Sequence, residues 1–223
     1  MTVDDNNPSH VSAFTDGSRS DTSQSAACGV YIPRIQFKGS WKLNKLTSSY
    51  TAELMGIRQA LHILYDHNQE EITIYSDSQA AIQAISDYKF DSNPAITEII
   101  ETIMNHHAAG TKINLAWIPS HCGIHGNEEA DRLATEGCTS PSRGHIDNTI
   151  SIQEIIAAFN LVWRSKVINN SVGQSSNIAV TSRFRSFGPL AWHLHDNRQI
   201  QTALFKLRSG HNRLNHSRGR WNT

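Results

Sequence analysis

The amino-acid sequence predicts a mixed α/β fold, in which one β-sheet carries helices on its faces. The first observation is that three short apolar segments near the start of the 223-residue chain are separated only by short loops, which is typical of an antiparallel meander. The second is that, from residue 48 onward, strand-like segments alternate with segments of helical periodicity. Together these patterns predict the order β-β-β-α-β-α-α-β-α and a mixed sheet.

The first three strands are marked by apolar residues in alternation or in short runs. Residues 11–16 alternate with the period of a strand, and we expect Asp16 to end this strand before a polar loop over residues 18–25. Residues 26–32 form the second apolar segment, which a proline stops, and residues 35–43 form the third. Short loops between them favour antiparallel pairing.

The first helix is expected to open at Ser48 or Ser49, where a serine can cap it. Its buried face is formed by apolar residues at helical spacing, namely Leu54, Ile57, Leu61 and Leu64. Glu53 lies beside this face. The fourth strand, over residues 71–76, leads directly into Asp77.

The remaining elements of the sheet domain follow in the same alternation. A short helix is expected over residues 80–85, and a longer one begins at Asn93, which is followed by a proline suited to the first helical turn. Residues 113–118 form the last strand. The helix over residues 128–138 is expected to have Asn127 as its N-cap.

The chain divides into parts of different composition. Residues 1–8 are polar and are expected to be a disordered N-terminus, and residues 9–139 carry the alternating strands and helices. Residues 140–150 contain a proline and a glycine and are interpreted as a linker. We interpret residues 151–223 as a small, basic, helical C-terminal extension.

The extension contains two predicted helices. Ser151 and Glu154 have the spacing of a capping box at the start of the first helix, and a polar, loose segment is expected over residues 169–182. A second amphipathic helix is expected over residues 197–208.

The net charge of zero hides two halves of opposite sign. Residues 1–139 hold 17 acidic and 9 basic residues, a net charge of −8, whereas residues 140–223 hold 3 acidic and 11 basic residues, a net charge of +8. This asymmetry fits a metal-binding catalytic domain followed by a segment that binds a polyanion. The alternative is that the basic tail is merely solvated or binds non-specifically.

Composition limits the class of protein. Hydrophobic residues make up 38% and charged residues 18% of the chain, and no apolar run approaches the length of a membrane span, so we expect no membrane partner. The three cysteines are odd in number and lack metal-type spacing, which favours reduced thiols in an intracellular protein. Nucleus and cytoplasm are not distinguished by this argument.

Four carboxylates recur at the edges of apolar elements, namely Asp16, Glu53, Asp77 and Asp131. Each has an ordinary explanation: Asp16 as a turn residue, Glu53 as a solvated helix residue, Asp77 as a helix N-cap, and Asp131 as a favourable charge near a helix start. If the first and fourth strands are neighbours, however, Asp16 and Asp77 lie side by side where ligands commonly bind such sheets.

Carboxylates brought together in this way repel one another and require cations between them at neutral pH. Oxygen-only ligands favour a hard ion, so we expect Mg²⁺, with Mn²⁺ as the alternative, rather than zinc. Two such ions about 4 Å apart can activate water and stabilise the leaving oxygen in phosphodiester hydrolysis.

Each of the four acids also lies in a short motif. The motifs are Thr15-Asp16-Gly17-Ser18, Thr51-Ala52-Glu53-Leu54, Ser76-Asp77-Ser78-Gln79, and a segment that runs from His121 through Asn127-Glu128 to Asp131. In order and spacing they resemble the four signatures of the type 1 ribonuclease H family, over residues 9–138. The resemblance implies a ribonuclease H-like fold with a five-stranded mixed sheet. It also implies Mg²⁺-dependent endonucleolytic cleavage of the RNA strand of an RNA–DNA hybrid, leaving 5′-phosphate and 3′-hydroxyl ends.

The resemblance assigns roles to individual residues. It implies that Asp16, Glu53, Asp77 and Asp131 hold two Mg²⁺ ions, with Asp16 bridging both. His121 matches the mobile catalytic histidine of the family, and the nearby His125 is interpreted as incidental. Substrate contacts are implied for Ser18, Ser48, Ser49, Gln79 and Asn127.

Other features look most like the ribonuclease H of non-LTR retrotransposon polyproteins. The loop over residues 118–123 (IPSHCG) has this character, and the basic protrusion of many cellular enzymes is absent between residues 87 and 96. Ser49-Tyr50 stands where the family often has an asparagine pair. Residues 207–211 (LRSGH) resemble a segment that follows the nuclease in such elements. This resemblance implies an upstream reverse transcriptase in the same polyprotein and a C-terminal extension that is truncated here.

Two other functional hypotheses stay open at this stage. One is a catalytically inactive ribonuclease H-like module that binds nucleic acid or tethers a partner. The other is a free-standing cellular ribonuclease H with an unusual tail.

Overall fold

A computed structural model describes residues 9–67, 69–88, 93–139 and 144–171 of the chain. Five strands form one sheet in the order β3-β2-β1-β4-β5. Their bounds are β1 His10–Ser20, β2 Ser25–Ile32, β3 Phe37–Leu43, β4 Glu71–Ser76 and β5 Lys112–Trp117. Strands β1, β2 and β3 pair antiparallel, whereas β4 runs parallel to both β1 and β5, so the sheet is mixed.

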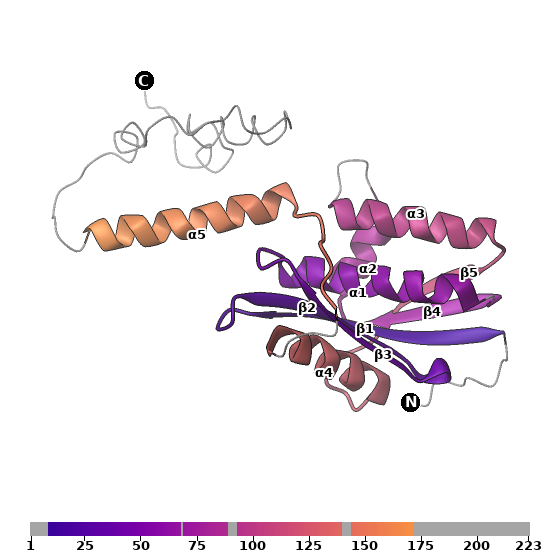
Figure 1. The fold of residues 1–223 in the computed structure, drawn as a ribbon. Helices are drawn as coiled ribbons and strands as arrows, with labels where there is room; N and C mark the ends of the chain where they lie inside the picture. The colour runs from indigo at the N-terminus through magenta and orange to yellow at the C-terminus, as the bar shows by residue number, and fades with distance from the viewer. Residues whose placement is uncertain (1–8, 68, 89–92, 140–143, 172–223) are drawn as a thin grey trace, which may run out of the picture. The chain divides into compact units, whose positions relative to one another are not determined.

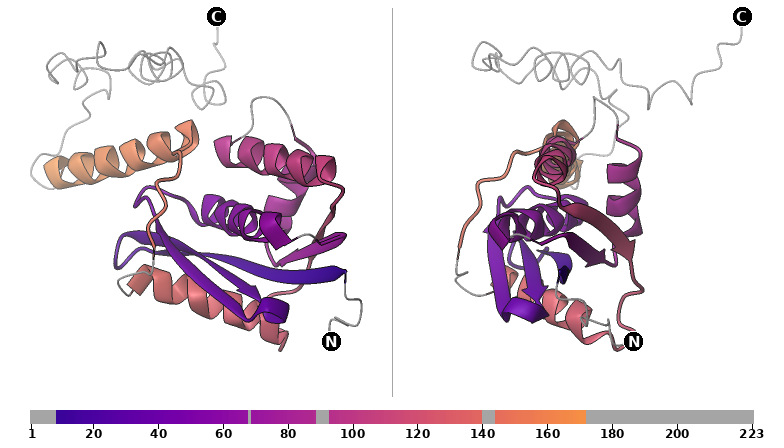
Figure 2. Two further views of the ribbon diagram at one scale, coloured as in Figure 1. Left: turned by 45° about the vertical axis from the view of Figure 1, so that its right-hand side comes forward. Right: turned by 90° about the vertical axis from the view of Figure 1, so that its right-hand side faces the viewer.

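Helices cover both faces of this sheet. Figures 1 and 2 show α4 on one face and α1 with α3 on the other. The helices are α1 Ser49–Leu64, α2 Gln79–Ser86, α3 Pro94–Ala108, α4 His125–Thr139 and α5 Ile152–Ser171, with short 3₁₀ turns at Pro33–Ile35 and Tyr65–His67. The mixed α/β prediction and the predicted element order are confirmed.

The core lies mainly between the sheet and α1. The apolar positions predicted for the first helix are all buried, namely Leu54, Ile57, Leu61 and Leu64. They pack with buried strand residues such as Val11, Ile72 and Ile74. Burial of this stripe holds α1 against β1, since burying each large apolar side chain contributes about 1.5–3 kcal/mol.

The expectation that Asp16 ends the first strand is wrong. Strand β1 continues to Ser20, because after Asp16 it still pairs with β2 through Gly17↔Cys28 and the positions that follow. What ends near Asp16 is the parallel pairing with β4, whose last partners are Thr15 and Ser76. The polar residues after Asp16 looked like a loop, but the hairpin with β2 supplies their backbone hydrogen bonds.

The interpretation of residues 140–150 as a linker needs correction for the part that the structure describes. His145 makes a parallel bridge with Lys42 of β3, and the compact unit that contains the sheet ends at Ile155. The amide of Lys42 donates to the carbonyl of Gly144, and the amide of Ile146 donates back to the carbonyl of Lys42. Residues 144–146 are therefore tied to the edge strand β3.

Helix α5 matches the first predicted helix of the extension in place. The predicted disordered N-terminus, the helix over residues 197–208 and most of the loose segment over residues 169–182 lie outside the described residues. Within the described part of the chain, no helix combines the length and apolar character needed to span a membrane.

Candidate active site

Adjacent parallel strands bring Asp16 and Asp77 together. The expected adjacency of the first and fourth strands is confirmed: β1 and β4 pair in parallel, with Thr15 opposite Ser76. The residue that follows each of these partners is an aspartate, so Asp16 and Asp77 lie at the same level of the sheet. This level is the carboxyl end of the parallel pairing between β1 and β4, and open α/β sheets bind ligands at such ends.

Helix α1 supplies the third carboxylate. Of the two serines expected to open the helix, Ser48 caps it by accepting a hydrogen bond from the amide of Thr51 at 3.1 Å. Glu53 follows one and a half turns later, on the side of the helix that meets β1. The approach is close at Gly17, where an added Cβ would lie 2.2 Å from the Glu53 backbone nitrogen. A glycine beside Asp16 thus lets the helix carry Glu53 up to the strand.

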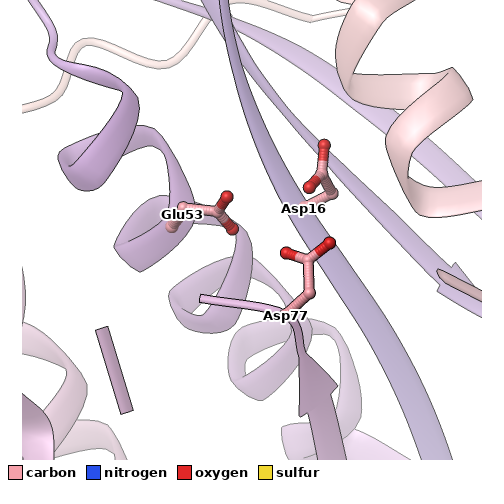
Figure 3. Close-up of side chains that lie close together, drawn as sticks. All are labelled: Asp16, Glu53 and Asp77. Carbon is pink, nitrogen blue, oxygen red and sulfur yellow. The ribbon is translucent and has the colours of Figure 1, made fainter. Parts of the chain in front are cut away.

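The three carboxylates converge. Asp16, Glu53 and Asp77 each place one oxygen within 4.8 Å of the others, and Figure 3 shows the three side chains pointing toward one another from β1, α1 and the end of β4. One oxygen of Glu53 is buried without a hydrogen-bond partner among the described residues. Hard oxygen donors with an unsatisfied buried atom fit a divalent cation such as Mg²⁺ or Mn²⁺.

The crowding has an electrostatic signature. Burial, followed by the negative charges of Asp77 and Asp131, raises the pKa of Asp16 to about 7. Burial, followed by the charges of Asp16 and Asp77, raises the pKa of Glu53 to about 9. In both cases a hydrogen bond from the Gly17 backbone partly opposes the rise. A bound cation would favour the ionised carboxylates and would therefore lower the pKa values of Asp16 and Glu53.

Asp77 is not the N-cap of the following helix, which was its ordinary alternative. Ser78 caps α2 by accepting from the amide of Ala81 at 3.3 Å. The Asp77 carboxylate instead accepts a hydrogen bond from the Asn127 side chain at 3.1 Å, and its backbone carbonyl accepts one from the Trp117 indole at 3.0 Å. Side chains from α4 and β5 therefore hold Asp77 beside Asp16.

The expectation that Asn127 is the N-cap of the last sheet-domain helix is wrong. Helix α4 begins two residues earlier, at His125, and Asn127 lies buried in its first turn. The side-chain amide points to Asp77 rather than to the backbone of its own helix. Spacing along the sequence could not show this, because the contact joins residues 50 positions apart.

Asp131 lies outside the three-carboxylate cluster. It is half-buried on α4, and its charge still contributes to the raised pKa of Asp16. Phe14, two residues before Asp16 on the same strand face, packs with Ala130 of α4. The helix thus brings Asp131 toward Asp16, and its role as a fourth ligand stays a prediction.

The two loop histidines differ in their surroundings. His121 is exposed and adopts a left-handed backbone conformation with a φ of 53°, in the loop between β5 and α4. His125, in contrast, packs edge-on against the ring of Tyr31 at 5.9 Å between centroids. The exposed loop position suits a histidine that reaches a bound substrate, although the role of His121 stays a prediction.

The residues predicted to contact substrate lie on the elements around the cluster. Ser18 follows Asp16 on β1, Ser48 and Ser49 open α1, and Gln79 is the exposed first residue of α2. The hydroxyl of Ser48 is occupied by capping. These substrate contacts stay predictions.

Three side chains to which the sequence assigned no role in the site contact the loop before α1. Arg19 donates to the backbone carbonyls of Lys45 and Thr47, while Asn148 and Glu154 reach the same loop from the C-terminal side. The capping-box spacing of Ser151 and Glu154 was a signal for a helix start. That spacing did not indicate that Glu154 contacts Ser48, more than 100 positions earlier in the sequence.

The fold and the site together define a class of protein. A mixed sheet that gathers three carboxylates where the parallel pairing of β1 and β4 ends defines an α/β domain with oxygen ligands of the kind that suit a divalent metal ion. The family model described as RNase H matches residues 8–139, more than half of the chain. The chain therefore belongs to the RNase H family, and its fold is the ribonuclease H-like fold expected from the resemblance.

Proposed function

We propose that this protein hydrolyses the RNA strand of RNA–DNA hybrids endonucleolytically, leaving 5′-phosphate and 3′-hydroxyl ends. The observation that carries the proposal is the convergence of Asp16, Glu53 and Asp77 in a chain that belongs to the RNase H family. The partner is then an RNA–DNA hybrid and the cofactor is Mg²⁺, with Mn²⁺ as the alternative.

The carboxylates would hold two divalent ions between them. Asp16 would contribute to both ion sites, Glu53 and Asp77 would complete one of them, and Asp131 would be an additional ligand of the other. Bound there, the ions would supply an activated water and stabilise negative charge on the leaving 3′ oxygen. Asn127 and Trp117 keep Asp77 oriented throughout, because they bond its carboxylate and its backbone carbonyl.

His121 is proposed to move protons or assist product release. An imidazole side chain can accept a proton on one ring nitrogen and donate one from the other. Its exposed loop lies immediately before α4, the helix that carries Asp131.

The test is cleavage of an end-labelled RNA–DNA hybrid by the full chain in Mg²⁺, beside a single-stranded RNA of the same sequence. We expect the hybrid RNA to be cut internally and the single strand to be spared. If folded protein leaves the hybrid intact in both Mg²⁺ and Mn²⁺ while a control ribonuclease H cuts it, the proposal fails.

We further propose that the domain belongs to a retrotransposon polyprotein with a reverse transcriptase upstream, where it removes RNA from the hybrid after DNA synthesis. The support is the IPSHCG loop and the basic C-terminal segment, whose charge suits nucleic acid. Reverse-transcriptase sequence immediately upstream in the gene is the expected finding. Its absence would favour a free-standing cellular enzyme.

An inactive binding module is the competing function. The crowded carboxylates argue against it, since a binder of nucleic acid gains nothing from negative charges that repel phosphates. Titration with Mg²⁺ separates the two functions, because a binding module should show no saturable site that depends on Asp16.

A further inference from the structure

A short C-terminal segment beyond the RNase H family match packs against the start of the helix that carries Glu53. The match ends at residue 139, whereas the compact unit that contains the sheet extends to Ile155. Residues 144–146 exchange backbone hydrogen bonds with Lys42 at 3.0 and 2.9 Å, which fixes the segment along the edge strand β3.

Asn148 joins this segment to the loop before α1. It is only 7% exposed. Its side-chain oxygen accepts from the amide of Asn44 at 3.0 Å, and its side-chain nitrogen donates to the hydroxyl of Thr47 at 3.0 Å. A buried side-chain amide satisfied on both its donor and acceptor sides orders the chain that it contacts.

Glu154 makes the contact nearest to the active site. Its carboxylate is 6% exposed and accepts a 2.6 Å hydrogen bond from the amide of Ser48, the N-cap of α1. The other oxygen accepts from the amide and the hydroxyl of Ser151, each at 2.8 Å. Burial alone would raise the pKa of Glu154, but the hydrogen bonds from Ser48 and Ser151 hold it below its ordinary value, so this buried acid is ionised.

The position of Ser48 connects this contact to the reaction. From Ser48 the helix runs without interruption through Ser49 to Glu53, so a displacement of its first turn moves both. The same loop is bound by Arg19, three residues beyond Asp16 on β1, which donates to the carbonyl of Thr47. The loop thus contacts both the strand that carries Asp16 and a carboxylate outside the family match.

We propose that Glu154 is a positioning residue for the nuclease reaction: by holding the Ser48 amide it sets the first turn of α1, and with it Glu53 and the predicted substrate contact Ser49. This inference rests on the proposed function. It assigns a role in the active site to a residue beyond the end of the RNase H match.

The test compares full-length variants that remove this contact in steps. Glu154→Gln keeps the shape but turns an NH₂ group toward one of the two backbone amides, Glu154→Ala removes the acceptor, and Ser151→Ala removes one donor to it. Glu101→Gln, at an exposed position of α3, is the matched control for loss of a carboxylate. All are assayed well below their melting temperatures, so that only folded protein is compared.

We expect kcat/KM for a hybrid to fall about tenfold in Glu154→Ala, with Glu154→Gln between it and the wild type, because small displacements of a catalytic group slow reactions strongly. The Mg²⁺ concentration for half-maximal activity should rise in the same order, and exchange of the Ser48 amide proton, followed by NMR, should accelerate. Glu101→Gln should match the wild type in all three measurements. A residue that only stabilised the fold would change the melting temperature and none of these.

The proposal is overturned if folded Glu154→Ala retains the wild-type kcat/KM and Mg²⁺ dependence. If that variant does not fold, Glu154→Gln decides: unchanged kinetics and unchanged Ser48 exchange overturn the proposal. If the wild-type chain cleaves no hybrid, the proposed function fails separately, and the inference is then judged by Ser48 exchange and by Mg²⁺ titration of the variants.

Discussion

Asp16 stands where the pairing of β1 with β4 stops and its pairing with β2 continues. At that point its carboxylate leaves the sheet beside Asp77 and meets Glu53 from α1. The raised pKa values of Asp16 and Glu53 show that, without a cation, this arrangement disfavours the ionised acids. The site is destabilised by the charges that its proposed chemistry needs.

Replacing Asp16 by asparagine should therefore separate activity from stability. We expect hybrid cleavage in Mg²⁺ to fall by at least about a hundredfold, because the shared ligand of the two proposed ions is lost. The metal-free protein should unfold at the same temperature or higher at pH 8, because one repelling charge is removed. Cleavage assays and thermal unfolding by circular dichroism measure the two effects.

The comparison variant is Asp87→Asn, at an exposed position just after α2. It should keep full activity and show little change in melting temperature. Wild-type activity in Asp16→Asn would contradict the assignment of Asp16 to the metal site.

At the scale of elements, the site depends on how closely α1 approaches β1. The contact is made at Gly17, where a Cβ would meet the backbone of Ala52 and Glu53 at 2.2–2.7 Å. Backbone atoms of a hydrogen-bonded helix that packs against the sheet cannot move aside locally. The glycine therefore sets the distance between the two elements and, with it, the distance between Asp16 and Glu53.

Gly17→Ala should push α1 away from the strand. We expect a loss of about 1–3 kcal/mol in the free energy of unfolding from overpacking, measured by urea denaturation. Activity of the folded fraction should fall as well, because Glu53 moves with the helix. Retention of both wild-type stability and activity would show that the helix does not need this close approach.

Gly39→Ala on β3 is a useful contrast for this prediction. There an added Cβ would also lie 2.2 Å from its nearest neighbour, but that neighbour is the outer edge of the half-buried Trp41 ring. A side chain can turn away where a helix backbone cannot. Gly39→Ala should consequently cost less stability than Gly17→Ala and leave activity unchanged.

For the whole molecule, the carboxylate cluster couples stability to pH and to metal. Asp16 and Glu53 have pKa values raised to about 7 and about 9 in the folded, metal-free protein. Above the ordinary carboxyl pKa of about 4, the folded state then binds more protons than the unfolded chain. The contribution of these groups to stability is therefore fully present at low pH and is lost as the pH rises through their raised values.

We expect the melting temperature of the metal-free protein to fall between pH 6 and pH 9, and Mg²⁺ to raise it more at pH 9 than at pH 6. The reason is that ionised carboxylates bind the ion, and a ligand of the folded state stabilises it. Scanning calorimetry in a chelator and in Mg²⁺ measures this. The double variant Asp16→Asn, Glu53→Gln should lose both the fall and the Mg²⁺ effect, and an unchanged pH dependence in it would refute the coupling.

Local patterns in the sequence predicted the class of fold, the order of the elements and the candidate metal ligands. These follow from local information: the period of apolar residues distinguishes strand from helix, Ser48 and Asn93 cap their helices as expected, and the four acids lie in recognisable motifs. Such signals depend on residues within a few positions of one another, and these residues are enough to favour a helix, a strand or a helix cap in that part of the backbone.

The contacts that hold the site in place became apparent in the folded structure. It showed that β1 runs past Asp16 because β2 pairs with it, that Asn127 turns to Asp77 instead of capping α4, and that Glu154 binds the amide of Ser48. Each of these contacts joins residues that are distant in the sequence. Such residues come within hydrogen-bond distance only when the helices and strands pack together. Local patterns could propose which carboxylates matter, whereas the folded chain determines what keeps them in place.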